Sequence, residues 1–349
     1  MSEIWILGAS GRSGRVIAAE LAARQMPMVL LGRNASALDT LAKTIGSEAR
    51  VVLASSVEAI VRELTKSRPL VVINTIGPFT QMALPIARAP GTHYLDIGNE
   101  LPAFLDLFAM HDQAVKTGRC IVPGAAWGVL ATESVVLKLC EGQPPALRVR
   151  VDNLAVVDAT GPLGPTLAAT VLDNLGYGGR RYDNGLLKRV RLGSDRLRLT
   201  LPDGSIIETG SIPSGELEAA RRASGALYAV AGFPQMPPPM VGALLPVLAA
   251  LLSIPAIGNL ARRRFAAMEA PAPTRKVSWA HARVEWPDGR TREGWLRAGD
   301  AYAFLARTVA GIATRLARGD GRPGVFTPGA LFGPELAVEA GGAFVLDPA

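Results

Sequence analysis

Apolar runs alternate with amphipathic stretches over residues 1–125. Continuous apolar strands separated by helices with one apolar face are typical of a parallel, doubly wound α/β sheet. The pattern predicts such a sheet for the N-terminal part of the chain. The expected strands are 4–7, 28–31, 51–54, 70–74, 92–96 and 119–123, and the expected helices are 15–24, 36–45, 56–66, 82–89 and 102–117.

The pattern changes after Trp127. Over 187–207 apolar and charged positions alternate with a period of two, which predicts a β-hairpin with apolar side chains on one face. We interpret the opposite face as solvated, with a polyanion site as the alternative. That face carries Arg189, Arg191, Arg196 and Arg198.

Further signals complete a second domain. A Pro-Asp-Gly turn within 277–296 predicts another hairpin, and the apolar spacing over 300–319 predicts a helix that ends at a glycine. We therefore expect a doubly wound domain at 1–125, completed by part of 300–349. An α+β domain with an antiparallel sheet is expected at 126–299.

A glycine-rich turn joins the first expected strand to the first helix. Its sequence is Gly-Ala-Ser-Gly-Arg-Ser-Gly at 8–14. Glycines let the backbone approach a pyrophosphate closely, and the following helix N-terminus offers free N–H groups to the anion. Because the turn lies between a strand and a helix, it predicts a Rossmann-type dinucleotide site. The expected cofactor contacts are Gly8, Ser10, Gly11, Arg12, Ser13 and Gly14.

The second expected strand indicates which dinucleotide is bound. In NAD-binding domains an acidic residue about 20 positions after the glycine turn holds the ribose 2′-hydroxyl, whereas an arginine suits a 2′-phosphate. Here the strand ends in Gly32-Arg33-Asn34, and no acidic residue lies between Leu21 and Ala37. Arg33 and Asn34 are therefore predicted contacts of NADP(H); an ordinary surface arginine is the alternative.

Polar and ionisable residues gather where three more strands end. The fourth strand runs into Asn-Thr-Ile-Gly-Pro-Phe at 74–79, and the fifth contains Tyr-Leu-Asp-Ile-Gly-Asn-Glu at 94–100. The sixth runs into Pro-Gly-Ala-Ala-Trp-Gly at 123–128. Ligands of doubly wound sheets lie beyond the carboxyl ends of the strands. We therefore expect these segments to converge on the nicotinamide half of the cofactor.

Composition narrows the class of protein. The chain has 349 residues, of which 49% are hydrophobic and 19% charged, as in a globular enzyme of two domains. Two cysteines and three histidines do not make a disulfide scaffold or an imidazole zinc site, so we expect no metal and a cytoplasmic location. The net charge of +7 is carried mainly by scattered arginines. That pattern excludes a nucleic-acid stripe and fits an anionic cofactor.

The uncharged segment 241–261 is long enough to span a membrane. Its prolines and glycines favour packed short helices or a dimer contact instead. Membrane association, helped by the arginines at 262–264, is the alternative. We expect a homodimer acting on a small-molecule or carrier-tethered substrate.

The glycine turn and the three strand-end segments resemble, in the same order, motifs of the saccharopine dehydrogenase-like family of NADP-dependent oxidoreductases. That family includes saccharopine reductases, trans-acting enoyl reductases and some thiazolinyl imine reductases. A late Pro-Gly-Val-Phe-Thr-Pro run at 323–328 looks like the family's C-terminal turn. Asn99 and Ala126 replace two of the family's glycines. Both add side chains near the expected nicotinamide pocket, so we expect a different substrate shape.

By this resemblance the reaction is hydride transfer from NADPH to a polarised double bond. The protein must also provide a proton for the atom left negative. Tyr94 and Asp96 project from the same side of their strand, and we predict that one of them donates or orients that proton. His93 faces the opposite way and is interpreted as a packed histidine.

The resemblance also places substrate and cofactor contacts. Glu100 is a predicted substrate contact, with capping of the following helix as the alternative. Trp127 is another, with a buried hinge aromatic as the alternative. The predicted substrate contacts are Asn74, Glu100 and Trp127. Thr75, Gly77 and Pro78 are predicted cofactor contacts in addition to the glycine turn, Arg33 and Asn34.

Three functions stay open on the sequence. The leading hypothesis is reduction of a C=N bond, including a cyclic imine such as a thiazoline on a biosynthetic intermediate. The alternative is a trans-acting reduction of C=C on a carrier-bound acyl chain. A non-catalytic NADP sensor would use the same fold, since fold alone does not establish function.

Overall fold

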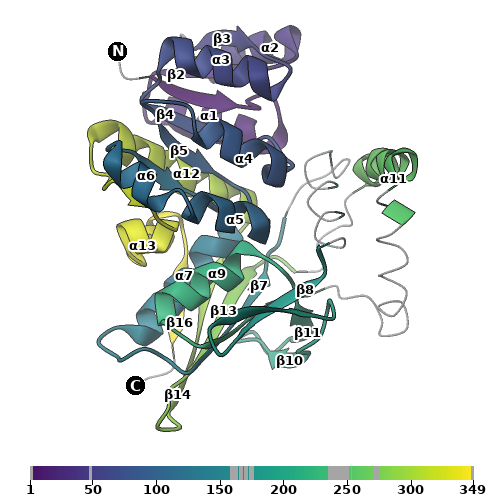
Figure 1. Ribbon diagram of the computed structural model, residues 1–349, viewed down its shortest axis with the longest axis vertical. Coiled ribbons are helices and arrows are strands. Elements are labelled where there is room, and N and C mark those ends of the chain that lie inside the picture. The colour runs from purple at the N-terminus through teal and green to yellow at the C-terminus, as the bar shows by residue number, and fades with distance from the viewer. Residues whose placement is uncertain are drawn as a thin grey trace. The chain divides into compact units, whose positions relative to one another are not determined.

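The computed structural model describes residues 3–46, 49–157, 177–234, 254–269 and 275–346, together with the single positions 164, 168, 172, 251 and 252 (Figure 1). The chain forms two compact units. The first comprises Met1–Gly98, Pro102–Trp127 and Tyr302–Phe332, and the second comprises Asn99–Leu101, Gly128–Ala301 and Gly333–Ala349. A segment near the C-terminus thus completes the N-terminal unit.

A seven-stranded parallel sheet forms the centre of the first unit, in the order β15-β6-β5-β4-β1-β2-β3. Strand order reverses between β1 and β4, which is the switch point where doubly wound folds bind their ligands. The predicted doubly wound class is confirmed. The strands are β1 (Ile4–Leu7), β2 (Met28–Gly32), β3 (Arg50–Leu53), β4 (Val71–Asn74), β5 (His93–Asp96), β6 (Cys120–Val122) and β15 (Gly324–Val325).

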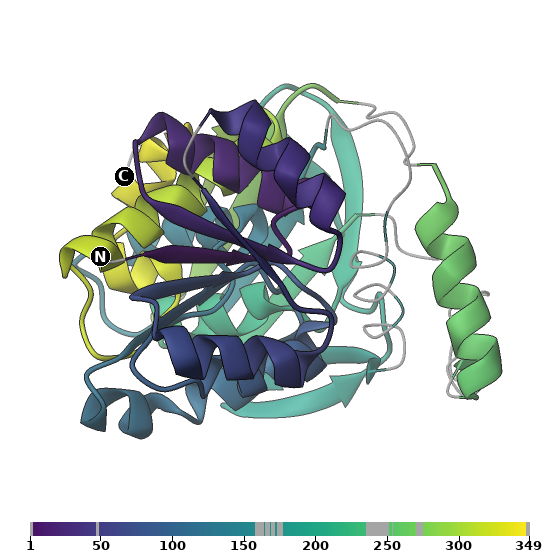
Figure 2. The ribbon, with the colours of Figure 1, turned by 90° about the horizontal axis from the view of Figure 1, so that it is seen from above.

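Helices cover both faces of this sheet (Figure 2). The expected helix over 102–117 is two helices, because the chain breaks at Ala109-Met110 and still buries Leu107, Met110 and Ala114 in one core. The helices are α1 (Arg12–Ala23), α2 (Ala35–Ile45), α3 (Val57–Ser67), α4 (Phe79–Ala87), α5 (Leu101–Phe108), α6 (His111–Lys116), α12 (Ala301–Arg318) and α13 (Pro328–Phe332).

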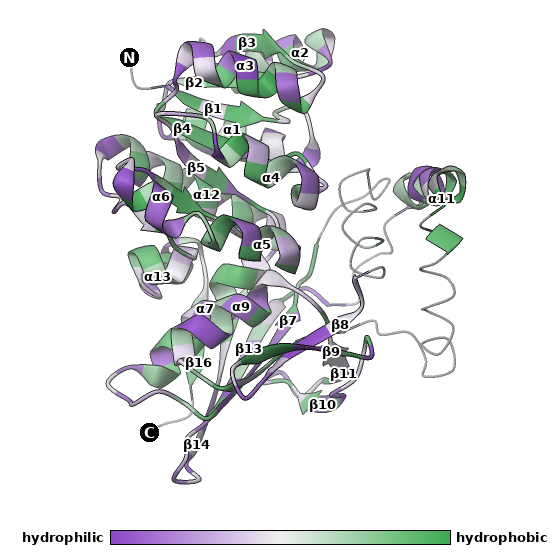
Figure 3. Cartoon of the chain, in the orientation of Figure 1, coloured by the Kyte–Doolittle hydropathy of each residue, from purple (hydrophilic) through white to green (hydrophobic). Residues whose placement is uncertain are grey.

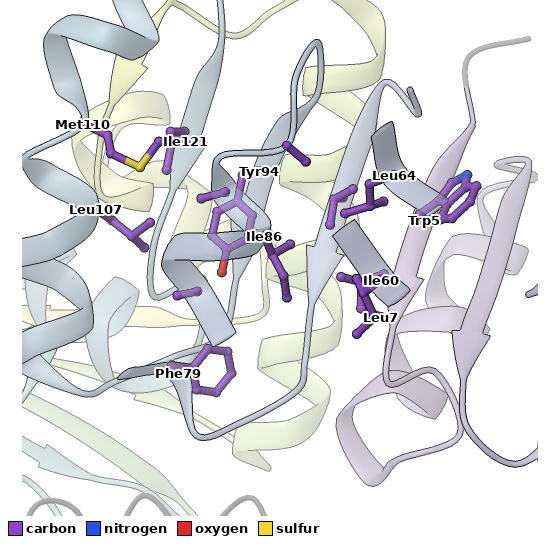
Figure 4. Close-up of a cluster of buried hydrophobic side chains, with 14 of the residues drawn as sticks. Trp5, Leu7, Ile60, Leu64, Phe79, Ile86, Tyr94, Leu107, Met110 and Ile121 are labelled. Carbon is purple, nitrogen blue, oxygen red and sulfur yellow. The ribbon is translucent and has the colours of Figure 1, made fainter. Parts of the chain in front are cut away.

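Burial explains why the strands of this unit read as unbroken apolar runs. Every residue of β1 and β2 is buried, because helices pack on both sides of the sheet. Trp5, Leu7 and Tyr94 belong to one large core cluster (Figure 4). Figure 3 shows the strands as mainly hydrophobic and the helices as banded, in keeping with one buried face per helix.

The second unit is built on a nine-stranded sheet. Its main path is β10-β11-β12-β7-β13-β14-β16, and β8 joins β12 to β9. The β7–β12 pair is parallel and the other pairs are antiparallel, so the sheet is mixed rather than purely antiparallel. The strands are β7 (Arg148–Leu154), β8 (Gly179–Asp183), β9 (Leu186–Val190), β10 (Leu197–Thr200), β11 (Ile206–Ser211), β12 (Tyr228–Phe233), β13 (Ser278–Glu285), β14 (Thr291–Ala298) and β16 (Ala343–Leu346).

The two faces of this sheet differ. Helices α7 (Trp127–Cys140) and α9 (Gly215–Ser224) pack along one face (Figure 1). On that face Gly294 of β14, whose ladder partner on β13 is Ala282, lies beside Leu139 of α7. Because side chains alternate along a strand, Trp279 and His281 point to the other face. There Trp279 meets Trp295 edge to face, with ring centroids 6.1 Å apart. Two further helices of this unit are α11 (Pro255–Ala267) and α14 (Glu335–Glu339).

The prediction that residues 187–207 form one hairpin is wrong, because the two strands of this segment pair with other strands. Strand β9 pairs with β8, and β10 pairs with β11, so the residues between β9 and β10 do not form a hairpin turn. The solvated face is confirmed, since all four of its arginines are exposed: Arg189, Arg191, Arg196 and Arg198. The hairpin expected over 277–296 is confirmed as β13 and β14.

Most of the uncharged segment at 241–261 lies outside the described residues, and its last part lies in α11. Among the helices that the structure describes, none combines the length and apolar character needed to cross a bilayer.

Candidate functional site

The glycine turn is a tight backbone loop at the carboxyl end of β1. Gly8 adopts a left-handed conformation with φ of 77°. The N–H groups of Gly8 and Ala9 donate to the carbonyl of Leu31 at 2.9 and 3.1 Å. The N–H of Gly11 then donates to the carbonyl of Gly8 at 2.9 Å. These bonds fold the turn back over the carboxyl ends of β1 and β2, next to the switch point between β1 and β4.

Close packing explains why glycine occupies two positions of the turn. A Cβ on Gly8 would lie 2.7 Å from Oγ1 of Thr75, in a backbone conformation that side chains disfavour. A Cβ on Gly14 would collide with the carbonyl oxygen of Gly8 and lie 2.7 Å from Cα of Ala9. Thr75, a predicted cofactor contact, instead donates its hydroxyl to the carbonyl of Leu7 at 2.7 Å. It therefore ties the end of β4 to the turn.

Helix α1 begins directly in this turn, three residues earlier than predicted. Gly11 is its N-cap residue, and no side chain caps the helix. The N–H groups of Arg12, Ser13 and Gly14 therefore lie at the open, electropositive end of a helix, which suits an anion. The Arg12 guanidinium lies 5.9 Å from the centre of the Tyr302 ring. The turn thus has the form that a dinucleotide pyrophosphate requires.

The two predicted cofactor contacts that follow β2, Arg33 and Asn34, have different roles in the structure. Arg33 is exposed immediately after the strand, at the same edge of the sheet as the glycine turn. Asn34 is the N-cap residue of α2, and its Oδ1 accepts a hydrogen bond from the N–H of Ala37 at 3.0 Å. Its carbonyl oxygen is therefore engaged in helix capping. Arg33 is the cationic side chain here that fits a 2′-phosphate.

The residues at 74–79 form a second turn beside the first. Asn74 is fully buried; its Oδ1 accepts from the N–H of Ile76 at 3.0 Å, and its Nδ2 donates to the hydroxyl of Tyr94 at 3.1 Å. The Gly77–Pro78 peptide bond is cis. Asn74 therefore shapes its own turn and joins β4 to β5.

Tyr94 and Asp96 complete this buried network. The Tyr94 hydroxyl donates to Oδ2 of Asp96 at 2.9 Å, so the two side chains do lie on the same side of β5. The N–H groups of Gly98 and Gly124 both donate to Oδ1 of Asp96 at 2.9 Å. Tyr94 and Asp96 are each 1% exposed. The geometry therefore favours a positioning role, because Asp96 holds the ends of β5 and β6 together.

Two further aromatic residues are packed rather than open. Nδ1 of His93 accepts from the N–H of Cys120 at 2.9 Å, and burial together with nearby Arg119 lowers the pKa of His93. Trp127 is 3% exposed and meets Phe304 edge to face, with ring centroids 4.9 Å apart. For Trp127 the geometry favours the buried aromatic over a substrate contact.

Glu100 and Asn99 belong to the second unit. Glu100 is fully buried, and its Oε2 accepts from the N–H of Asn99 at 3.0 Å. Oδ1 of Asn99 accepts from the N–H of Gly215 at 2.9 Å, and Nδ2 of Asn99 donates to Oε1 of Glu216 at 3.1 Å. The side chain that replaces a family glycine therefore anchors the start of α9.

Sequence reasoning missed Glu216. This residue is 1% exposed, and its Oε1 also accepts from Nδ2 of Asn153 at 2.9 Å. Its Oε2 has no hydrogen-bond partner among the described residues. Burial raises the pKa of Glu216, although hydrogen bonding by Ser214, by the Glu216 backbone, and by Asn153 and Asn99 opposes the shift. In the sequence it looks like an ordinary acid in a first helical turn.

Gly128 shows how closely this cluster is packed. A Cβ at that position would collide with Oε1 of Glu216 and lie 2.5 Å from Nδ2 of Asn153. Along the chain, Asn99 follows the end of β5 by three residues and Gly128 follows the end of β6 by six. All four residues of the Glu216 cluster belong to the second unit, and the cluster is defined as Asn99, Gly128, Asn153 and Glu216.

These features define the first unit as a dinucleotide-binding domain of the Rossmann type. Residues 4–122 match the family described as the saccharopine dehydrogenase NADP binding domain. This segment of the chain matches that domain family, whose description names NADP as the bound cofactor. The resemblance stated from the motifs is confirmed for this domain.

Curated relatives match a comparable stretch. The trans-acting enoyl reductase of Mycobacterium tuberculosis (strain ATCC 25618 / H37Rv) is 30% identical over 148 residues, which cover 39% of this chain and 35% of the relative. The protein of the same name from Mycobacterium ulcerans (strain Agy99) is 33% identical over 131 residues, or 34% of this chain and 31% of the relative. The matched part thus spans about a third of each relative.

A solved structure extends the likeness in fold. The apo histidine-tagged saccharopine dehydrogenase (L-Glu forming) from Saccharomyces cerevisiae matches with a TM-score of 0.63 at 15% identity, covering 100% of both chains. At this identity the match shows a shared fold.

Proposed function

We propose that this protein is an NADPH-dependent oxidoreductase that reduces a polarised double bond. The observation that carries the proposal is the glycine turn. Gly8 and Gly14 leave no room for a Cβ there, and no side chain caps the N-terminus of α1. Exposed Arg33 lies at the same edge of the sheet. A turn without side chains lets backbone N–H groups approach a pyrophosphate closely. A guanidinium fits the 2′-phosphate of NADP(H).

Different residues of the protein bind the cofactor, select it and position the strand ends. NADPH, when bound, supplies the hydride. The turn from Gly8 to Gly14 binds the pyrophosphate, and Arg33 selects NADPH over NADH. The buried network of Asn74, Tyr94 and Asp96 positions the strand ends that carry the site. These residues orient the cofactor rather than react with it.

A proton must join the atom left negative after hydride transfer. Glu216 differs from Tyr94 and Asp96 because burial raises the pKa of its carboxyl. Its Oε2 is also unpartnered among the described side chains, whereas Asp96 accepts hydrogen bonds on both oxygens. We therefore propose a positioning role for Asp96 in the first unit and a separate, titratable role for Glu216 within the second unit.

The substrate we favour carries a C=C bond conjugated to a thioester, as on a carrier-bound acyl chain. What supports this choice is sequence similarity to trans-acting enoyl reductases at 30% identity. Hydride adds to the β-carbon and a proton to the α-carbon, which leaves the saturated thioester and NADP⁺. Reduction of a C=N bond, the leading hypothesis from the sequence, is the second candidate, because hydride and a proton add across that bond in the same way.

Turnover by the purified protein tests this proposal. NADPH oxidation is followed with an enoyl thioester, a cyclic imine, and an α-keto acid with an amine. We expect oxidation with the enoyl thioester, and oxidation with the imine alone would establish the second candidate. Tight NADPH binding without any turnover would favour the sensor hypothesis and contradict an enzyme.

The role of Glu216 is tested within the same assay. Glu216→Gln keeps the shape of the side chain but removes the ionisable carboxyl, so we expect NADPH affinity to be unchanged and the pH profile of kcat to lose any step that is due to Glu216. Glu141→Gln, at an exposed position, is the matched control. An unchanged pH profile of kcat in Glu216→Gln would show that Glu216 takes no part in turnover.

A further inference from the structure

Helix α11 of the second unit exposes an unusual concentration of large apolar side chains. Between residues 251 and 268 they are 42–56% exposed: Leu251, Ile254, Ile257, Leu260 and Met268. Isolated exposed apolar residues are normal, but several within five turns of chain indicate a contact surface. Figure 3 shows hydrophobic and hydrophilic bands side by side on α11.

Positive charge is concentrated on the same helix. Arg262, Arg263 and Arg264 follow one another, and no acidic residue occurs from 251 to 268. Arg263 and Arg264 are exposed, and no ion pair joins either one to a described residue. The other arginine-rich strands of this unit differ, because Arg181 and Arg196 there pair with carboxylates.

Helical spacing places the two kinds of side chain together. Ile257, Leu260 and Arg264 follow at intervals of three and four residues, so they form one row on the exposed side. Leu260 and Arg263 share the neighbouring row. The first half of the exposed side is therefore apolar and the second half is basic. Long arginine side chains can lie along apolar surface while their guanidinium groups reach phosphates.

We propose that α11, with Leu251, Ile254 and Met268 beside it, binds the surface of an anionic lipid membrane. Apolar side chains would enter the boundary between head groups and acyl chains, and the arginines would contact lipid phosphates. This is peripheral binding by a helix lying in the interface. It goes beyond the proposed reductase activity and is independent of it.

Charge decides against a second copy of this chain as the occupant. A two-fold contact brings the same patch of each copy together, so the exposed Arg263 and Arg264 of one copy would face those of the other. Like charges at such short range oppose the contact. A surface of anionic lipid complements both features of α11.

Co-sedimentation with lipid vesicles tests the proposal on the full chain. Wild-type protein is mixed with vesicles of phosphatidylcholine alone or of phosphatidylcholine with phosphatidylglycerol. We expect binding to the vesicles that contain phosphatidylglycerol, weakened by salt. Neutralising both exposed arginines in the double variant Arg263→Gln, Arg264→Gln should weaken it roughly 30-fold, at about fivefold for each charge near the membrane.

Matched controls isolate the contribution of the apolar residues. Leu260 and Leu53 are 56% and 57% exposed, and Leu53 lies on β3 of the first unit. We expect Leu260→Ser to weaken vesicle binding by about tenfold or more and Leu53→Ser to leave it unchanged. Circular dichroism and NADPH binding confirm that the variants are folded.

Three results would overturn the proposal. Wild-type protein does not bind either vesicle, or binds both alike, or binds as before after Leu260→Ser. Analytical ultracentrifugation tests whether a second copy of the chain, rather than a membrane, binds α11. If Leu260→Ser converts a dimer into a monomer and vesicle binding is unaltered, α11 is a contact between copies. The vesicle-binding and oligomeric-state measurements do not depend on whether the protein turns over a substrate.

Discussion

Asp96 and Glu216 are both carboxylic acids sealed from water, yet their surroundings prepare them for different tasks. Asp96 accepts hydrogen bonds on both oxygens, from the Tyr94 hydroxyl and from the N–H groups of Gly98 and Gly124. Glu216 accepts two bonds on Oε1 and none from the described residues on Oε2. The first arrangement stabilises a strand edge, and the second leaves a carboxyl oxygen available.

The comparison shows that burial alone does not identify a catalytic acid. What differs is how completely the hydrogen-bonding capacity of the carboxyl is used. Asp96 lies in the position where the sequence predicts chemistry, but its bonds are those of a structural clamp. Glu216 lies in the second unit, in a helix whose sequence gives no catalytic motif, and burial raises its pKa.

Removing the clamp should have the largest effect. Asp96→Ala leaves three buried donors without an acceptor, so we expect the free energy of unfolding to fall by about 3–5 kcal/mol. Urea denaturation measures this change. Asp106→Ala, an exposed aspartate in α5, should change it by less than about 0.5 kcal/mol. A loss of under about 1 kcal/mol for Asp96→Ala would mean that the network is not a clamp.

Glu216→Gln should act in a pH-dependent way. A carboxyl whose pKa is raised on folding above its model value of 4.5 binds a proton more tightly in the folded protein. Wild-type stability therefore falls as pH rises above 4.5 towards the folded-state pKa, at about 1.4 kcal/mol for each pH unit. The glutamine cannot ionise, so the variant should gain stability relative to wild type over that range. Parallel pH curves would show that Glu216 is not shifted.

Asn99→Ala should raise the pKa of Glu216 further and should change stability less than Asp96→Ala does. It removes one hydrogen bond that lowers the pKa of Glu216 and one acceptor for the N–H of Gly215. We expect a stability loss of about 1–2 kcal/mol at neutral pH. The decline of stability with pH should continue to a higher pH than in wild type. If the pH curve keeps its wild-type shape, Asn99 does not influence Glu216.

The sequence predicts the first unit well because its determinants are local. The apolar runs that form β1 and β2, and the glycines of the turn, are contiguous in the chain, so strand, turn and helix can be read directly. Strand-end polar residues can be read in the same way. Their roles depend on contacts across strands, as when Gly124 donates to Asp96, and these cannot be read from spacing.

The second unit is harder to predict for the same physical reason. The alternation in 187–207 is real, but pairing is decided by partners elsewhere, since β9 joins β8 and β10 joins β11. The Glu216 cluster brings together residues as distant in sequence as Asn99 and Glu216, which are 117 positions apart. The packing that seals Glu216 exists in the fold and leaves no motif in the chain.

The central claim is that the glycine turn and Arg33 form a site for NADP(H). Its most direct test is calorimetric titration of NADPH and NADH into wild-type protein and the Arg33→Ala variant, with exposed Arg198→Ala as the control. We expect wild type and the control to prefer NADPH. Arg33→Ala should weaken NADPH by about 10–100-fold, as for a lost charge-assisted contact, and leave NADH nearly unchanged. Equal weakening of both dinucleotides, or no preference in wild type, would contradict the account.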